Sequence, residues 1–107
     1  MNIILDLDET LLHSTYELKD SSPDCTYRGR YVYFRPNVIE FIVELNKIAS
    51  ISIWSSAKAD YAKFCLKKLF SDLALFESIK TRKDCKRKQV WNGFSNETYY
   101  IKDLSNY

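Results

Sequence analysis

The sequence contains little glycine and proline, with two residues of each among 107, so long flexible linkers and disordered segments are not expected. No apolar run approaches the roughly 18–20 residues that a helix needs to cross a bilayer. The chain begins with Met1 and Asn2 and enters an apolar run at once, which leaves no room for a signal peptide. We therefore expect an intracellular protein, cytoplasmic or nuclear, that is not secreted and has no membrane partner.

Cysteine and histidine are also scarce. The three cysteines, Cys25, Cys65 and Cys85, are odd in number and widely separated, and His13 is the single histidine. A zinc site is therefore not expected, because such sites need several Cys and His ligands at short spacings. We interpret the cysteines as reduced thiols, with Cys65 on a helix face, and His13 as a packing or hydrogen-bonding residue rather than a base.

The residues that are plentiful are typical of one globular domain. Hydrophobic residues make up 46% of the chain, aromatic residues 15% and charged residues 28%. A chain of this length has room for one core. We expect residues 1–107 to form a single domain, with a polar excursion at about 15–30 and a basic insertion at about 80–98.

The net charge is only +2, but one segment is strongly basic. Residues 80–88 contain one acidic residue, Asp84, and a run of basic residues: Lys80, Arg82, Lys83, Lys86, Arg87 and Lys88. Three interpretations stay open for this segment: a solvated loop, a surface that steers a phosphorylated or acidic partner, and a nuclear-localisation or nucleic-acid patch.

Hydrophobic periodicity predicts alternating strands and helices. Short apolar runs indicate strands, and apolar spacing of three and four residues indicates helices. The expected strands are 2–7, 31–34 (closing a hairpin near Tyr27), 51–54 and 75–79; the expected helices run from Pro36 to about 49 and from about 58 to 70; the polar stretch 81–98 contains a turn at 91–93, and 99–101 is extended. This alternation predicts an α/β fold with a central parallel sheet and right-handed crossovers.

Two aspartates, Asp6 and Asp8, lie at the end of the first expected strand, after the apolar run Ile3–Leu5. Like charges this close raise one another's pKa unless a cation offsets them. Mg²⁺ prefers oxygen ligands of this kind, and an ionised aspartate can attack phosphorus as a nucleophile. Ser55 follows the next parallel strand, and ligands of such sheets bind beyond the carboxyl ends of the strands. The alternative is an acidic turn without chemistry, because this short pattern is common in loops.

The acidic pair belongs to a longer motif, Asp6–Ser14, which resembles the first motif of the haloacid-dehalogenase-like (HAD) phosphatases. More narrowly, it resembles the branch that contains the RNA polymerase II C-terminal-domain (CTD) phosphatases and the NLI-interacting-factor-like proteins. Further matches follow in the same order: Phe34–Phe41, Ile53–Ala57 with Tyr61 and Ala62, and Tyr100–Ser105. These matches cover nearly the whole chain. The resemblance implies a HAD-like three-layer sandwich with a central parallel sheet.

The resemblance also implies a chemistry, the Mg²⁺-dependent hydrolysis of phosphoserine or phosphothreonine in a protein segment through an aspartyl-phosphate. Asp6 would be the nucleophile and a metal ligand, while Asp8 would act as general acid and base and bind the metal through its carbonyl oxygen. Thr10 would hold the turn. The Ser55 hydroxyl would bind the phosphoryl oxygens, and Lys102 would bridge the nucleophile and the phosphate.

Two other residues receive weaker interpretations. Arg35 precedes Pro36 and would either bind substrate phosphate or form a structural ion pair. Trp54 is interpreted as a core residue.

The sequence departs from the family pattern at its C-terminal end. The family's last strand and its acidic pair, which supplies a further metal ligand, have no match before Tyr107. We therefore expect a truncated chain, a metal with fewer protein ligands, or a partner subunit or second copy that pairs with the exposed apolar edge at 2–7. Weak metal affinity and weak activity are expected of these residues alone.

The alternatives for function follow from these matches and gaps. No large cap separates the first two motifs, so the open site suits a protein segment better than a small metabolite. A binding module without turnover is the main alternative. A nucleic-acid 3′-phosphatase shares the first motif, but the matches at Arg35 and Lys102 favour a protein substrate, so nucleic acid is not the expected partner.

Overall fold

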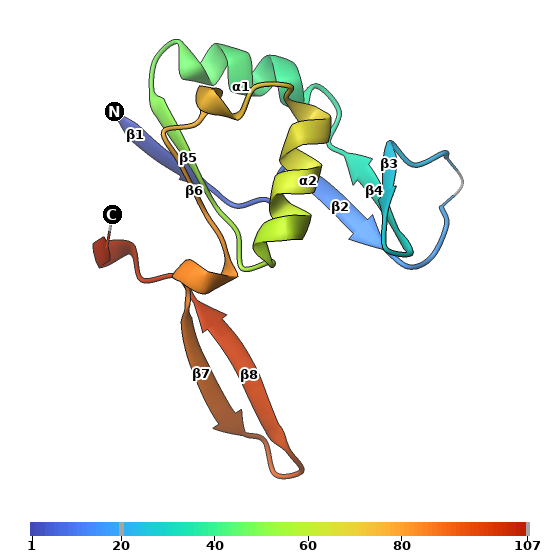
Figure 1. Cartoon of the computed structure of the whole chain (residues 1–107), viewed down its shortest axis with the longest axis vertical. Coiled ribbons are helices and arrows are strands. Elements are labelled where there is room, and N and C mark those ends of the chain that lie inside the picture. The colour runs from blue at the N-terminus through green and yellow to red at the C-terminus, as the bar shows by residue number, and fades with distance from the viewer. Residues whose placement is uncertain (20, 107) are drawn as a thin grey trace.

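The computed structural model describes residues 1–19 and 21–106. Figure 1 shows two helices beside a small parallel sheet, a separate antiparallel sheet, and a long hairpin that extends away from both. The elements are β1 (Asn2–Leu5), β2 (Leu12–Thr15), β3 (Cys25–Tyr27), β4 (Arg30–Phe34), α1 (Val38–Asn46), β5 (Ser50–Trp54), α2 (Ala59–Leu69), β6 (Ser78–Lys80), β7 (Lys86–Trp91) and β8 (Asn96–Ile101), with short 3₁₀ turns at Leu73–Leu75, Arg82–Asp84 and Leu104–Asn106.

The central sheet is parallel and has the strand order β1-β5-β6. This confirms the predicted α/β fold with a central parallel sheet. The first strand is shorter than predicted, because it ends at Leu5 rather than at residue 7, and it is exposed as the expected edge strand would be: Ile4 is 36% exposed. The reason is that β1 lies at the edge of the sheet as described, paired with β5 alone, so one side of it faces solvent.

The core lies between this sheet and the two helices. Ile42 of α1, Ile53 of β5 and Leu66 of α2 are fully buried in one cluster. Burying one such side chain contributes about 1.5–3 kcal/mol relative to leaving it exposed. The predicted α2 face is confirmed, because Cys65 is buried there and its pKa is raised to about 11 by that burial. Trp54 is also buried, as expected of a core residue.

The boundaries of three elements differ from the predictions. The first helix begins at Val38 rather than near Pro36, because Asn37 has a positive φ of 62°, which no helical residue can have. It ends at Asn46, and the second helix spans Ala59–Leu69. The third parallel strand is Ser78–Lys80 rather than 75–79, because a 3₁₀ turn ends only at Leu75.

The second sheet is antiparallel, with the strand order β2-β4-β3. It contains the hairpin predicted near Tyr27, which pairs with Arg30. Arg28 and Gly29 form the turn with φ values of 44° and 84°, a left-handed pair that two-residue hairpin turns favour. The turn that carries Asp6 and Asp8 connects β1 to β2, so the parallel sheet and this antiparallel sheet meet at the two aspartates.

For the stretch at 81–98 the sequence predicted a polar, basic segment with a turn and indicated no strand, whereas the structure has β7 and part of β8 there. β7 pairs with β8 over its whole length, from Lys86 with Ile101 to Trp91 with Asn96. Every residue of β7 is exposed, so its sequence shows no alternation between buried and exposed positions. The turn lies at Asn92–Ser95, one residue beyond the predicted position, and the side chain of Asn92 accepts N–H groups from Phe94 and Ser95 there.

No helix among the described residues is both long enough and apolar enough to cross a membrane.

Candidate active site

The acidic motif forms a tight turn at the carboxyl end of β1. Leu7 is fully buried and fixes the turn to the core, so Asp6 and Asp8 lie on either side of an anchored residue. The Leu7 carbonyl accepts the N–H groups of Thr10, Leu11 and Leu12 at 3.3, 2.9 and 3.3 Å. These bonds hold the two carboxylates in place.

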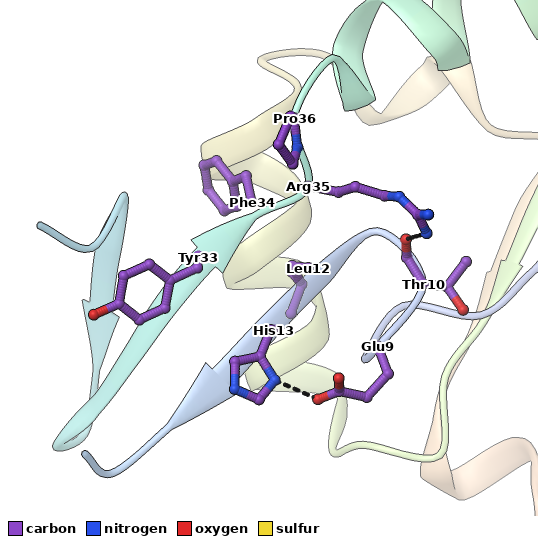
Figure 2. Close-up of a pocket in the computed structure, with 8 residues that line it drawn as sticks. All are labelled: Glu9, Thr10, Leu12, His13, Tyr33, Phe34, Arg35 and Pro36. Carbon is purple, nitrogen blue, oxygen red and sulfur yellow. Dashed lines mark hydrogen bonds and ion pairs between the residues drawn. The ribbon is translucent and has the colours of Figure 1, made fainter. Parts of the chain in front are cut away.

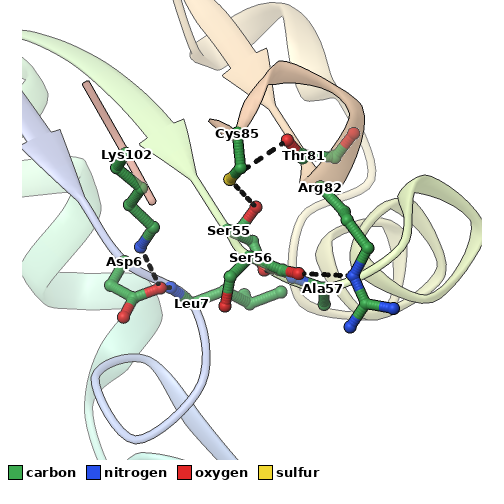
Figure 3. Close-up of polar contacts among 9 residues, drawn as sticks. All are labelled: Asp6, Leu7, Ser55, Ser56, Ala57, Thr81, Arg82, Cys85 and Lys102. Atoms are coloured by element: carbon green, nitrogen blue, oxygen red, sulfur yellow. Dashed lines mark hydrogen bonds and ion pairs between the residues drawn. The ribbon is translucent and has the colours of Figure 1, made fainter. Parts of the chain in front are cut away.

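Asp6 forms an ion pair with the lysine that follows β8. Lys102 Nζ lies 2.9 Å from Asp6 Oδ1, and Oδ1 also accepts the N–H of Leu7 at 2.8 Å (Figure 3). The Lys102 side chain is 25% exposed, so water screens this pair only in part. The pair brings together residues from opposite ends of the sequence, and it is the contact that the family resemblance implies for the nucleophile and the lysine.

Asp8 is held by a tyrosine of α2. The Tyr61 hydroxyl donates a hydrogen bond of 2.8 Å to Asp8 Oδ1, and its oxygen lies 3.0 Å from Ser14 Oγ. Burial is the main influence on Asp8 and raises its pKa above the ordinary aspartate value; the Tyr61 bond lowers the pKa, and the charge of Asp6 raises it. Asp8 therefore holds a proton more readily than an exposed aspartate.

Ser55 lies at the carboxyl end of β5, in the loop beside Asp6 (Figure 3). It is almost fully buried; its N–H donates to the Lys80 carbonyl at 2.9 Å, and its hydroxyl accepts the Ala57 N–H at 3.0 Å. The bond to Lys80, at the end of β6, thus fixes the predicted phosphate-binding serine beside the aspartates.

Arg82 joins this region, although the sequence analysis placed it only within the basic run. Its Nε donates to the Ser56 carbonyl at 2.9 Å, and its backbone N–H donates to the Ala57 carbonyl at 2.9 Å (Figure 3). Its guanidinium also lies 4.3 Å from the centre of the Tyr100 ring. No local motif marked this residue, because its partners lie far from it in the sequence.

Arg35 supports the turn that carries the aspartates through a contact with Thr10. Arg35 Nη1 donates to the Thr10 carbonyl at 3.1 Å (Figure 2). The sequence left substrate phosphate and an ion pair open for Arg35, and the structure gives it this backbone contact. His13 Nδ1 lies 2.5 Å from Glu9 Oε1, which is the hydrogen-bonding role expected of it. These residues line a cavity of about 420 Å³ together with Leu12, Tyr33, Phe34 and Pro36.

Metal-binding capacity rests on the two aspartates. Within the described residues no group of three or more histidine, cysteine or acidic side chains is placed so that it could hold a metal ion. The Asp6 carboxylate and the carbonyl oxygen of Asp8 are hard oxygen donors, and Mg²⁺ commonly binds one or two carboxylates and completes its shell with water and phosphate oxygens. The chemistry of this donor set fits Mg²⁺.

Comparisons with known proteins show the family and the fold of the chain. The family model described as NLI interacting factor-like phosphatase matches residues 1–107. The phosphatase PSR1 of Saccharomyces cerevisiae is 29% identical over 110 residues, which cover 96% of this chain and 24% of that protein. Two structures of the RNA polymerase II CTD phosphatase Fcp1, one of them from fission yeast and bound to beryllium fluoride, match with a TM-score of 0.61.

What each match shows depends on its sequence identity and on the share of each chain that it covers. The Fcp1 structures are 20% identical to this chain, and the match covers 77% of it and 29% and 30% of theirs, so the likeness shows the fold alone. The chain spans less than a third of the length of each of these relatives.

Proposed function

The chain belongs to the NLI interacting factor-like phosphatases, and we propose that it hydrolyses phosphoserine or phosphothreonine in protein segments, with Mg²⁺ and an aspartyl-phosphate on Asp6. The observation that carries this proposal is the ion pair between Asp6 and Lys102, formed next to Asp8 at the carboxyl end of β1. It combines a nucleophile, a cation and a proton donor in one place.

The first step is the attack of Asp6 on phosphorus. A carboxylate oxygen of Asp6 forms a bond to phosphorus, and the bond from phosphorus to the serine or threonine oxygen breaks. A carboxylate and a phosphate dianion repel one another by several kcal/mol where solvation is poor. Lys102, at 2.9 Å from Asp6, offsets part of this repulsion and stabilises charge on the phosphoryl oxygens.

Asp8 moves the protons in both steps. It gives its proton to the leaving alcohol, then takes a proton from the water that attacks phosphorus and releases Asp6 and phosphate. Its raised pKa keeps it protonated to higher pH than an exposed aspartate, as the first step requires. Tyr61 holds its carboxyl group in a fixed orientation.

Mg²⁺ would be held by the Asp6 carboxylate and by the carbonyl oxygen of Asp8. When bound, it supplies positive charge that neutralises the phosphoryl oxygens. In Figure 3, Ser55 and Arg82 lie on the side of the site away from Lys102, and we assign their hydroxyl and guanidinium groups to the phosphoryl oxygens, which such donors suit. Because Arg35 donates to the Thr10 carbonyl, we assign it to support of the turn rather than to the phosphate.

Turnover of p-nitrophenyl phosphate tests this proposal. We expect hydrolysis with Mg²⁺, loss of it after EDTA treatment, and recovery with Mg²⁺ but not with Ca²⁺, which prefers more ligands and longer bonds. Beryllium fluoride is expected to inhibit by occupying the phosphoryl position on Asp6. Turnover that survives EDTA unchanged would contradict the metal assignment, and the absence of any turnover would favour a binding module.

Substrate class is tested with matched phosphomonoesters. A phosphoserine peptide is expected to be hydrolysed with a higher kcat/KM than a 3′-phosphorylated oligonucleotide. The opposite order would favour a nucleic-acid 3′-phosphatase.

Tyr61 provides a further prediction about Asp8. Replacing Tyr61 by phenylalanine keeps the ring but removes the donor to Asp8. We expect kcat to fall by about tenfold, which is less than the roughly hundredfold or more that general acid–base catalysis itself contributes, because Asp8 remains in place. The matched control is Tyr27→Phe, which removes a hydroxyl that donates to Asp60 at 2.6 Å and does not contact Asp8. Equal effects of the two substitutions on kcat would show that Tyr61 acts through packing alone.

A further inference from the structure

The β7–β8 hairpin adds almost nothing to the core, so its surface is what it contributes to the protein. It extends away from the body (Figure 1), and every side chain of β7 is exposed. Its internal contacts include a bond of 2.6 Å from Asn92 to Glu97 and a bond from the Tyr99 hydroxyl to Glu97. An isolated two-stranded hairpin is only marginally stable, so this hairpin adds little to the stability of the protein, and a role in binding accounts for it better.

The stem of the hairpin is basic on both faces. Lys86 and Lys88 lie on one face, where the pairing register sets them opposite Ile101 and Tyr99. Arg87 lies on the other face, opposite Tyr100. Aromatic side chains lie toward the tip: Trp91 is 62% exposed and Phe94 is 92% exposed. The stem thus carries positive charge and the tip carries apolar surface.

The basic stem is continuous with the active site. A cavity of about 750 Å³ is lined on one side by Lys86, Arg87 and Lys88, and on the other by residues 101–105. One of these residues is Lys102, the partner of Asp6. The carboxylate in this lining belongs to Asp103, which accepts the Ser105 hydroxyl at 2.6 Å and its N–H at 3.1 Å. Positively charged side chains therefore extend from Lys102, beside the Asp6 nucleophile, onto the stem of the hairpin.

We propose that the β7–β8 hairpin is a docking arm that binds an acidic segment of the phosphoprotein substrate. The inference rests on the proposed function, because it takes the phosphorylated residue to lie at Asp6 while the chain beside it runs along the hairpin. Carboxylates or further phosphates of that segment pair with Lys86, Arg87 and Lys88. β7 has six residues, and an extended chain advances about 3.3 Å per residue, so a peptide that runs along β7 in an extended conformation covers it with about six residues of its own.

The exposed edges of the hairpin favour a protein over a nucleic acid. The sheet contains two strands within the described residues, so each strand has one edge whose backbone N–H and C=O groups face outward. An extended peptide can add to such an edge as a further strand, which a nucleic acid cannot do. Basic side chains beside this edge then select acidic peptides.

Charge reversal tests the docking arm. The variant K86E/K88E is assayed on a phosphoserine peptide with glutamates beside the phosphoserine, on the same peptide with glutamines, and on p-nitrophenyl phosphate. We expect kcat/KM for the acidic peptide to fall by about tenfold, mainly through KM, because two attractive contacts become repulsive. The other two substrates are expected to change by less than about twofold, because they offer no carboxylate to pair with these exposed lysines, and exposed charges without a partner contribute little. K86Q/K88Q is expected to have a smaller effect in the same direction.

The matched control is K63E/K67E, which makes the same charge change at two exposed lysines of α2. It is expected to leave the preference for the acidic peptide intact. That preference is also expected to weaken as salt is added, because exposed charges are screened. Equal effects of the two double variants would show a general charge effect and overturn the docking arm.

Two further outcomes separate the docking arm from the proposed function. Binding of an unphosphorylated acidic peptide, measured by fluorescence anisotropy, needs no turnover and is expected to be lost in K86E/K88E but not in K63E/K67E. An inactive wild type that still binds this peptide would overturn the proposed function and leave the arm. An active wild type that hydrolyses the glutamate and glutamine phosphopeptides equally well would overturn the docking arm. Tighter binding of a single-stranded oligonucleotide than of the acidic peptide to the hairpin would overturn it as well.

Discussion

Replacing Asp6 by asparagine is expected to lower kcat for p-nitrophenyl phosphate by at least about a thousandfold, because an amide oxygen cannot replace the carboxylate as the nucleophile. The fold is expected to remain, since the asparagine oxygen can still accept the N–H of Leu7 that Asp6 Oδ1 accepts at 2.8 Å. The measurement is steady-state turnover with Mg²⁺, combined with acid quenching of the enzyme after brief exposure to a radiolabelled phosphopeptide. Label should remain bound to the wild type and not to the variant.

The control for Asp6→Asn is Glu77→Gln, which removes one negative charge at an exposed position outside the site. It is expected to retain the turnover of the wild type. If Asp6→Asn hydrolyses the substrate as fast as Glu77→Gln does, the nucleophile has been assigned wrongly. If both variants bind label, the covalent intermediate lies on another residue.

The residues found from the sequence are those whose positions follow from sheet topology or from a local motif. Asp6 and Asp8 follow the first strand, and Ser55 follows the next parallel strand, so the rule that sites form at the carboxyl ends of strands places them together. Lys102 was found through its motif, because nothing local distinguishes it from an exposed lysine.

The residues that were missed depend on contacts between distant segments. Tyr61 was recognised only as part of a family match, and its bond to Asp8 depends on how α2 packs against the acidic turn. Arg82 was hidden within the basic run, and its bond to Ser56 appears only once β5 and β6 are paired. β7 was missed for a different reason: it buries no side chain, so hydrophobic periodicity could not indicate it.

Lys102 carries the second large prediction. Lys102→Met keeps much of the side chain's length but removes the charge that lies 2.9 Å from Asp6 Oδ1. Removing one well-placed group that stabilises transition-state charge typically costs about a hundredfold to a thousandfold in rate, and we expect kcat/KM to fall within that range. Lys102→Arg is expected to recover only part of the loss, because the planar guanidinium replaces a compact charge.

The size of this effect distinguishes a catalytic lysine from a surface ion pair. Lys47 pairs with Glu44 at the same distance, 2.9 Å, but its side chain is 65% exposed, whereas that of Lys102 is 25% exposed. Lys47→Met therefore removes a pair of equal geometry from open solvent, where such pairs contribute at most about 1 kcal/mol to stability and nothing to the reaction. It should leave kcat/KM unchanged. If Lys102→Met loses no more activity than Lys47→Met does, the charge beside Asp6 serves folding alone, and the attack on phosphorus must be stabilised by other groups.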